Sequence, residues 1–313
     1  MSPSILLAMP LAARLRERLA ALYEVHGPFS PVAPEGVPEA ARGARALITL
    51  GGHRTDAAMM DALPELGMIS CYGTGFEGVD LAEAARRGIL VTHAKDANAT
   101  SVAEFAMGLV IAAARDMGRG ERMLRAGQWR TIDSMGLVPG LAGARMGIYG
   151  LGAIGAKIAS RAAAFEMEVG YTGRGAKAGV GYAYHASLLE LAAWCDVLVV
   201  AVRASDETRH AVNAEVLAAL GKKGVVVNVA RGSVVDEAAL VEALEQGVIH
   251  AAGLDVFEHE PAIPARLMAV PNAVLTPHVA AFTTLAQRVQ QQLMVDALAT
   301  FFAGGVPGNV VAG

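Results

Sequence analysis

The sequence predicts an α/β protein with a doubly wound parallel sheet in each of two domains. The chain has 313 residues, which exceeds the usual size of a single domain. Apolar residues make up 54% of it and aromatic residues only 5%, a composition that suits buried strands covered by Ala-rich helices. Short apolar runs also alternate with helical patterns along the chain, as they do in repeated βαβ units.

The first part of the chain, up to residue 97, reads as strands separated by helices. The expected strands are Ile5–Met9, Ala46–Leu50, Met68–Tyr72 and Ile89–Thr92. Asp80–Arg87 is an expected helix that ends at Gly88. Ser101 and Glu104 have the spacing of a capping box, so we expect a long helix to begin there and to run through Leu124. This helix would carry the chain into the second domain.

The alternation of strands and helices restarts at Met146. Further strands are expected at Val169–Thr172, Asp196–Val202, Gly224–Ala230, Ala251–Val256 and Ala273–Thr276, and helices at Leu188–Ala193, Ala214–Leu220 and Glu237–Gln246. The closing helix, Thr283–Phe302, is too long for a mere tail, and we expect it to return to the first domain. One domain would then contain residues 1–97 and 283–313, and the other residues 98–282.

Composition and charge exclude several classes of function. The net charge is −4 without a long Lys/Arg run, which argues against nucleic acid as a partner. Cys71 and Cys195 form neither a CxxC motif nor zinc-type spacing, so we expect no metal site and two reduced thiols in a cytoplasmic protein. No apolar run is long enough to span a membrane, and the run at residues 5–12 is followed at once by charged residues.

A glycine-rich turn follows the strand that begins at Met146. Its residues are Gly150, Leu151, Gly152, Ala153, Ile154 and Gly155. In such a turn Gly150 permits the sharp bend, Gly152 lets the backbone approach a pyrophosphate, and Gly155 lets the helix close onto the strand. The helix N-terminus adds free N–H groups and the positive end of its dipole. This pattern predicts a Rossmann-like dinucleotide site.

The end of the next strand indicates which dinucleotide is bound. The strand ends in Thr172, Gly173 and Arg174, with no carboxylate at the position that would hold the ribose hydroxyls. A guanidinium there can engage a 2′-phosphate, and Lys177 is near enough in sequence to help. We therefore expect NADPH to be preferred over NADH. The alternative is that Arg174 is a solvated loop residue that only stacks on adenine.

Polar side chains follow three later strands. Arg231 follows the strand at 224–230, Glu260 lies in the loop after 251–256, and His278 follows the strand at 273–276. The three suit reduction of a 2-keto acid, because Arg231 can bind the substrate carboxylate and polarise the ketone. His278 can protonate the new alkoxide, and Glu260 can orient and stabilise the imidazolium.

Each of these residues has a simpler interpretation. Arg231 can be an exposed strand-end residue, and His278 a turn or core histidine. Glu258 and His259 offer an acid and a base beside Glu260. The remaining histidines lack such settings and are expected to be surface or packing residues: His26, His53, His93, His185, His210 and His250.

Four motifs follow one another along the chain: the glycine turn, Asn-Val-Ala-Arg-Gly at 228–232, Gly-Leu-Asp-Val-Phe-Glu-x-Glu-Pro at 253–261 and Thr-Pro-His at 276–278. With these motifs in this order, the chain resembles the D-2-hydroxyacid dehydrogenase family over about residues 45–303. Thr-Gly-Arg at 172–174 is most similar to the glyoxylate/hydroxypyruvate reductases of the family. The resemblance implies that Arg231, Glu260 and His278 are the catalytic residues.

The resemblance also implies the other site residues. Substrate contacts are implied for Leu50, Gly51, Gly73, Thr74 and Gly75, in addition to Arg231 and His278. Further cofactor contacts are implied for Val202, Arg203, Thr208, Val229, Ala230, Asp255 and Ala280. The implied fold is a discontinuous, flavodoxin-like substrate domain and a Rossmann domain with a cleft between them, in a homodimer. Relatives usually have Pro-Leu-Thr-Pro-x-Thr where this chain has Val202–Thr208.

The expected function is transfer of a hydride from NADPH to a small 2-keto acid such as glyoxylate or hydroxypyruvate, giving the D-2-hydroxy acid. Two alternatives stay open. One is a dinucleotide-sensing scaffold that resembles C-terminal binding proteins, which keep a similar Arg–Glu–His set. The other is an NAD-dependent phosphoglycerate-type dehydrogenase, which Arg174 disfavours.

Overall fold

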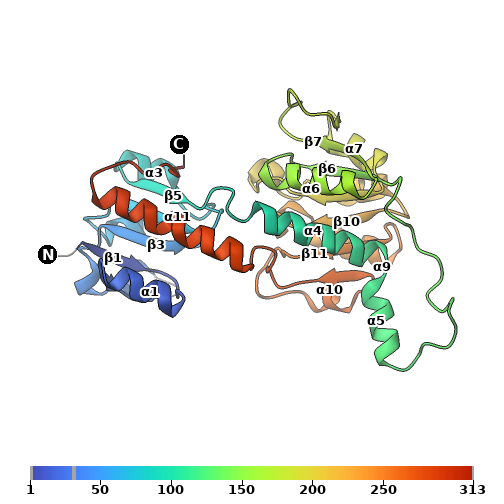
Figure 1. Cartoon of the computed structure of the whole chain (residues 1–313), viewed down its shortest axis with the longest axis horizontal. Coiled ribbons are helices and arrows are strands. Elements are labelled where there is room, and N and C mark those ends of the chain that lie inside the picture. Colours follow the sequence, from blue (N-terminus) through green and yellow to red (C-terminus); the bar gives the residue numbers. More distant parts are fainter. Residues whose placement is uncertain (1–2, 30–32, 312–313) are drawn as a thin grey trace. The chain divides into compact units, whose positions relative to one another are not determined.

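The chain folds into two compact α/β units, each built on a parallel sheet (Figure 1). The computed structural model describes residues 3–29 and 33–311. Unit 1 comprises Met1–Asn98 and Thr283–Gly313, and unit 2 comprises Ala99–Phe282. Two parallel-sheet α/β domains were predicted, and the structure confirms this fold class. Within the described ranges, no helix is both long and apolar enough to cross a membrane.

Unit 1 contains a five-stranded parallel sheet with the order β2-β1-β3-β4-β5. Its strands are β1 (Ser4–Leu7), β2 (Glu24–His26), β3 (Ala46–Leu50), β4 (Met68–Tyr72) and β5 (Leu90–His93). Its helices are α1 (Ala13–Ala20), α2 (Ala57–Asp61), α3 (Leu81–Arg86) and α11 (Thr284–Phe302), with 3-10 turns η1 (Pro34–Gly36) and η2 (Glu39–Ala41).

Alternate side chains of these strands enter two different cores, because successive residues of a strand point to opposite faces. Ile5 and Ile48 pack with α1 and α11 on one face. Leu6 and Leu47 pack with α2 and α3 on the other. The sheet is thus covered on both sides, which explains why its strands are continuous apolar runs.

Unit 2 contains a seven-stranded parallel sheet with the order β12-β11-β10-β9-β6-β7-β8. Its strands are β6 (Arg145–Tyr149), β7 (Glu168–Thr172), β8 (Ala183–Tyr184), β9 (Val197–Val200), β10 (Val225–Asn228), β11 (Ala251–Leu254) and β12 (Ala273–Leu275). Its helices are α4 (Ala99–Ala114), α5 (Met117–Arg125), α6 (Ala153–Ala164), α7 (Leu188–Trp194), α8 (Ala214–Leu220), α9 (Glu237–Glu245) and α10 (Ala265–Ala269), with 3-10 turns η3 (Asp206–Thr208) and η4 (Gly232–Val234).

Helices α4 and α6 cover one face of this sheet, and α7, α8 and α9 cover the other (Figure 1). Side chains of β6, β9 and β10 contribute to both cores. Helix α5 has no buried residue and, with the segment after it, extends away from the sheet of unit 2 in Figure 1.

The predicted helix from Ser101 to Leu124 was wrong in two respects. The helix begins at Ala99, and Ser101 is a buried residue within α4 rather than its cap. The helix also ends at Ala114, because Asp116 has a left-handed backbone with φ of 55°, and α5 is a separate helix. A residue in that conformation interrupts the hydrogen-bond ladder of an α-helix.

Candidate active site

The glycine turn lies at the switch point of the unit 2 sheet, where ligands of open α/β sheets bind. From β6 the chain passes to β7 on one side and later to β9 on the other. Gly150 has φ of 100°, and a Cβ atom on it would lie 2.6 Å from the Val202 Cα. A Cβ on Gly155 would lie 2.1 Å from the Gly150 carbonyl oxygen. Only glycine fits at these two positions.

The first turn of α6 is open toward a ligand. Among the described residues, no atom lies within 4 Å of a Cβ placed on Gly152, the N-cap residue, and no side chain caps the helix. Leu151 is buried, while Ala153 and Ile154 begin the helix. Uncapped N–H groups at a helix N-terminus suit a phosphate, so the residues present fit a dinucleotide.

Two cationic side chains follow β7 beside this turn. Thr172 is buried at the end of the strand, and Gly173 leads to the exposed Arg174. The Lys177 Nζ donates to the Leu151 carbonyl oxygen at 2.5 Å, which places a second cation at the glycine turn. Cations there suit a phosphorylated ligand.

The remaining predicted cofactor residues also lie near the carboxyl ends of strands in unit 2. Val202, Arg203 and Thr208 follow β9, and the Thr208 hydroxyl donates to the Arg203 carbonyl oxygen at 3.1 Å. Val229 and Ala230 are buried directly after β10. The buried Ala280 follows β12.

A turn fixed by Asn228 carries Arg231. The Asn228 amide nitrogen donates to the Arg231 carbonyl oxygen at 2.9 Å, and the Asn228 oxygen accepts from the Ala230 N–H at 3.0 Å. Asn228 is 1% exposed, so this turn is held from inside the protein. The Arg231 Nη1 donates to the Ala230 carbonyl oxygen at 2.8 Å.

Glu260 and His278 form the predicted acid–imidazole pair. The His278 Nδ1 and a Glu260 carboxylate oxygen are 2.7 Å apart, and the other carboxylate oxygen accepts from the Phe257 N–H at 2.9 Å. His278 has a left-handed backbone with φ of 53°, an uncommon conformation for a residue with a side chain. Because Nδ1 faces Glu260, the Nε2 atom is the one left for a substrate.

The charges around Glu260 favour its ionised form. Partial burial raises the pKa of the Glu260 carboxyl, but the hydrogen bonds from His278 and Phe257, with the charges of His278 and Arg231, hold that pKa below its ordinary value of 4.5. The carboxylate is therefore ionised at neutral pH. Arg231, Glu260 and His278 thus lie near enough to interact electrostatically.

Asp255 organises the loop that carries His278. Its carboxylate is 1% exposed and accepts from the Thr276 hydroxyl at 2.6 Å and from the N–H groups of Val279 and Ala280, each at 2.9 Å. The His278 N–H donates to the Asp255 carbonyl oxygen at 2.8 Å. The resemblance implied a contact with the cofactor, and this contact stays a prediction.

Glu258 braces the loop that carries Glu260. Its carboxylate accepts from Arg209 at 2.7 Å and lies 2.8 Å from the His210 Nε2. A Cβ atom on Gly232 would lie 1.8 Å from the Phe257 carbonyl carbon, so the turn after Arg231 packs directly on this loop. The sequence interpretation of His210 as a surface or packing residue missed this role, since its partner lies 48 residues away.

The predicted substrate residues of unit 1 lie on two loops that pack together. Leu50 ends β3, and a Cβ on the following Gly51 would lie 1.9 Å from the Gly75 carbonyl oxygen. In the second loop, the Gly73 carbonyl oxygen accepts from the Ala94 N–H at 2.6 Å. The His93 Nδ1 lies 2.9 Å from the Thr74 carbonyl oxygen, a contact that sequence reasoning also missed.

Comparisons with known proteins agree with this geometry. Residues 107–280 match the model of the D-isomer specific 2-hydroxyacid dehydrogenase family, NAD binding domain. Hydroxyphenylpyruvate reductase from Plectranthus scutellarioides is 37% identical over 301 residues, and 2-ketogluconate reductase from Gluconobacter oxydans is 38% identical over 300 residues. Each alignment covers 96% of this chain and 96% of the relative.

A solved structure covers the whole chain. It is the NADPH-dependent glyoxylate/hydroxypyruvate reductase from Sinorhizobium meliloti in complex with NADP and malonate. It is 38% identical, with a TM-score of 0.92, and the match covers 100% of this chain and 97% of that one. The chain therefore belongs to the D-isomer specific 2-hydroxyacid dehydrogenase family, and it is an enzyme that binds a nicotinamide dinucleotide.

Proposed function

We propose that this dehydrogenase reduces a small 2-keto acid with NADPH and releases the D-2-hydroxy acid. The observation that carries the proposal is the hydrogen bond of 2.7 Å between the His278 Nδ1 and Glu260, with the charge of Arg231 acting on the same carboxylate. An oriented imidazole beside a guanidinium suits protonation of a ketone oxygen next to a carboxylate.

Each residue has a defined part in this reaction. NADPH supplies the hydride, which adds to the keto carbon while the electron pair of the C=O bond moves to oxygen. Arg231 binds the substrate carboxylate and stabilises negative charge on that oxygen. The His278 Nε2 gives its proton to the oxygen, and the Glu260 carboxylate stabilises and orients the imidazolium on the opposite nitrogen.

The preference for NADPH rests on the charges that follow β7. Arg174 follows the end of β7 and Lys177 contacts the glycine turn, whereas the carboxylate of Glu168 stands at the opposite end of the strand. A guanidinium stabilises a 2′-phosphate by charge-assisted hydrogen bonds, and a carboxylate would repel it. The Sinorhizobium reductase, which is NADPH-dependent by description, supports the same preference.

The similar proteins support a 2-keto acid substrate but differ in its size. The Sinorhizobium enzyme is named for glyoxylate and hydroxypyruvate, and the two relatives for the larger hydroxyphenylpyruvate and 2-ketogluconate. Glyoxylate and hydroxypyruvate contain only the reacting keto acid and a minimal tail. They are therefore the reference substrates for a test of the function.

A homodimer is part of the proposal. Exposed apolar side chains gather on the segment after α5 in unit 2, where Trp129 is 58%, Ile132 95% and Leu137 105% exposed. Apolar side chains so exposed favour burial against another protein surface, and the family resemblance implies that the partner is a second copy. Light scattering of the purified chain tests whether it is a dimer. The double variant Ile132→Ser/Leu137→Ser is expected to shift the equilibrium toward the monomer.

The decisive experiment follows nicotinamide absorbance while NADPH and glyoxylate are mixed with the enzyme. His278→Gln is expected to lower kcat by at least a hundredfold while NADPH still binds, because only the acid is lost. Arg174→Ala is expected to raise the Kd of NADPH about tenfold and to leave that of NADH within twofold. Unchanged turnover in His278→Gln contradicts the assigned acid, and equal losses for both dinucleotides contradict the 2′-phosphate contact.

A further inference from the structure

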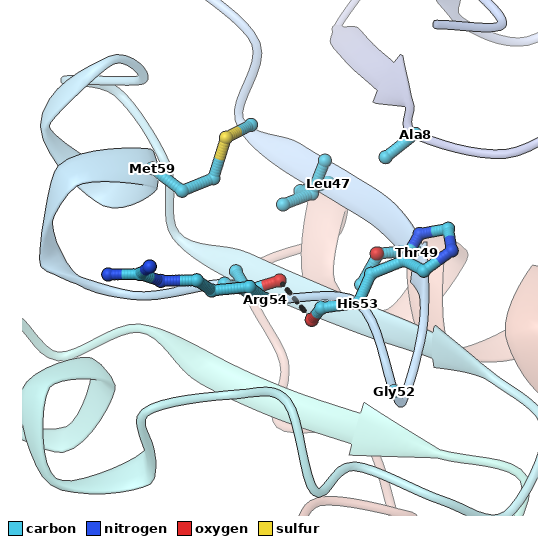
Figure 2. Close-up of a pocket in the computed structure, with 8 residues that line it drawn as sticks. Ala8, Leu47, Thr49, Gly52, His53, Arg54 and Met59 are labelled. Atoms are coloured by element: carbon cyan, nitrogen blue, oxygen red, sulfur yellow. Dashed lines mark hydrogen bonds between the residues drawn. The ribbon is translucent and has the colours of Figure 1, made fainter. Parts of the chain in front are cut away.

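Two cavities of unit 1 differ in whether their charged groups are already paired. Arg54 lines the cavity shown in Figure 2, and its Nε donates to the Asp56 carboxylate at 2.5 Å. The other cavity, of ≈ 310 Å3, lies between α11 and the segment that follows this helix. Its lining contains Lys95 and Asp296, two described residues that form no ion pair with each other. This second cavity therefore offers unpaired charge to a ligand.

One wall of the second cavity is a face of α11. Four residues of the helix line the cavity with the spacing i, i+3, i+4 and i+7 of a single face: Leu293, Asp296, Ala297 and Thr300. Met294 and Leu298 of the same helix are buried in the core of unit 1. The helix is thus anchored by a different face, which leaves this one for the cavity.

Another wall is the segment after α11, which is fixed to β5. Val310 forms an antiparallel bridge with Thr92. The His93 N–H donates to the Asn309 carbonyl oxygen at 3.2 Å, and the Asn309 amide nitrogen donates to the His93 carbonyl oxygen at 2.8 Å. Pro307, which lines the cavity, is buried. This wall is therefore held by the sheet and does not depend on a ligand.

The polar groups of the lining have bonding capacity left. In the part of the chain that the structure describes, the Lys95 ammonium makes neither a hydrogen bond nor an ion pair. The Asp296 Oδ1 accepts from the Gln292 Nε2 at 2.7 Å, which leaves the Oδ2 atom without a described partner. The side-chain oxygen of Asn309 is likewise left over, because its amide nitrogen makes the bond to His93. The cavity thus offers a cation at one point and oxygen acceptors at another.

The rest of the lining favours a small apolar body. Leu293 is half-buried, Ala297 is 2% exposed and Pro307 is buried, so these side chains present apolar surface to the cavity. The volume of ≈ 310 Å3 lies at the lower end of the range of roughly 300–1,000 Å3 for small-molecule sites. Thr300 lies in the last turn of α11, and the C-terminal end of a helix stabilises a cation.

We propose that this cavity binds a free α-amino acid with an aliphatic side chain, such as leucine. The carboxylate of the ligand pairs with the Lys95 ammonium, and its ammonium pairs with the side-chain oxygens of Asp296 and Asn309. The aliphatic side chain lies on the apolar part of the lining. The site lies within unit 1, and none of its residues belongs to the proposed catalytic or cofactor set. The inference therefore goes beyond the proposed function and does not depend on it.

The test measures Kd by isothermal titration calorimetry of the whole chain, without NADPH or a keto acid. The probes are leucine, 4-methylpentanoate, which lacks the ammonium, and 3-methylbutylamine, which lacks the carboxylate. Because each analogue loses charge-assisted hydrogen bonds, we expect leucine to bind at least about tenfold more tightly than either one. A leucine Kd weaker than about 1 mM, which is half the binding free energy of a micromolar site, would overturn the inference. Equal Kd values for leucine and either analogue would also overturn it.

Two variants connect the two charges of the ligand to the two charged residues. In Lys95→Ala, leucine should bind no more tightly than 3-methylbutylamine, whose own Kd should stay within about twofold of the wild-type value. In Asp296→Asn, which keeps an oxygen for Gln292, leucine should bind no more tightly than 4-methylpentanoate, whose binding should not weaken. Lys222→Ala removes an exposed lysine of unit 2 and is the matched control, which should keep every Kd.

A wild-type Kd for leucine in either cavity variant would place the amino acid elsewhere on the chain and would overturn the inference. The result is independent of the reductase proposal, because neither the hydride donor nor the keto acid is present in the titration. Reduction of keto acids is measured without an amino acid. Either proposal can therefore fail while the other stands.

Discussion

Replacement of Glu260 by Gln tests the proposed catalytic pair of Glu260 and His278 most directly. Gln retains an oxygen that can accept from the His278 Nδ1 but removes the charge that stabilises the imidazolium. A hydrogen bond to a charged group contributes about 1.5–3 kcal/mol, against about 0.5–1.5 kcal/mol for a neutral one. The difference is about 1–1.5 kcal/mol, and it is an upper bound because the Glu260 side chain is 35% exposed and its charge is screened in part. This corresponds to about a 5- to 13-fold decrease in kcat.

The loss of kcat in Glu260→Gln should depend on pH in a defined direction. Because the pKa of Glu260 is held below 4.5, the carboxylate contributes above that pH, and its contribution is lost as the pH falls through the lowered value. The ratio of wild-type to Glu260→Gln kcat should therefore be constant near neutral pH and decrease toward one in acid. The assay is NADPH oxidation with saturating glyoxylate.

The control for this variant is Glu245→Gln. It removes an exposed carboxylate at the end of α9 that pairs with Arg266, and it should change kcat less than twofold. The proposed role of Glu260 would be refuted by a kcat equal to that of the wild type at neutral pH, provided that the variant binds NADPH normally.

Three further predictions concern the surroundings of the site. Glu258→Ala should lower kcat about fivefold and leave the Kd of NADPH unchanged. Each hydrogen bond lost from Glu258 contributes about 0.5–1.5 kcal/mol to holding the loop that carries Glu260. Steady-state kinetics measure the change in kcat, and a fluorescence titration measures the Kd. Gly232→Ala should lower Tm by about 2–12 °C, since overpacking costs about 1–3 kcal/mol. In the control Gly181→Ala the added Cβ meets no described atom within 4 Å, so the Tm should not fall. Burial raises the pKa of Cys71 and Cys195 to about 12, so iodoacetamide at pH 8 should modify neither thiol until urea unfolds the chain, as mass spectrometry would show.

The central strands were the part of the fold most open to prediction from sequence. Ala46–Leu50 and Met68–Tyr72 were expected with the bounds that β3 and β4 have. Both are buried on two faces, so each is a continuous apolar run that ends at turn residues. Helix α8 also has its expected bounds, and the Asn213 side chain caps it by accepting from the Val216 N–H.

Elements with weak apolar patterns were missed or misplaced. Glu24–His26 forms β2 at the edge of its sheet, where one neighbour suffices and polar side chains face solvent. Ser101 has the spacing of a cap, but its burial within α4 outweighs that local preference. The left-handed turn at Asp116 was missed, although Gly118 and Gly120, which are poor helix formers, follow it closely.

In the candidate site too, sequence patterns identified some residues but not the contacts that orient them. Residue type, position after a parallel strand and the family resemblance together made Arg231, Glu260 and His278 the candidates, since the carboxyl ends of β10, β11 and β12 share one edge of the sheet. Their orientation depends on buried polar residues outside the proposed catalytic set. One of these, Asn228, acts over three residues and leaves a local signal. Asp255 has partners more than 20 residues away, which no local pattern specifies.

The acceptor oxygens of Asp255 and Glu260 explain how an exposed histidine can keep a fixed geometry. The side chain of His278 is 43% exposed, so packing alone would leave it several rotamers. Its backbone, however, is held between the carbonyl and the carboxylate of Asp255, and its ring is held by Glu260. The imidazole therefore keeps Nδ1 toward Glu260 without being buried, which leaves Nε2 for the proposed proton transfer. A general acid needs this combination, since its proton must reach the substrate from a group that does not move.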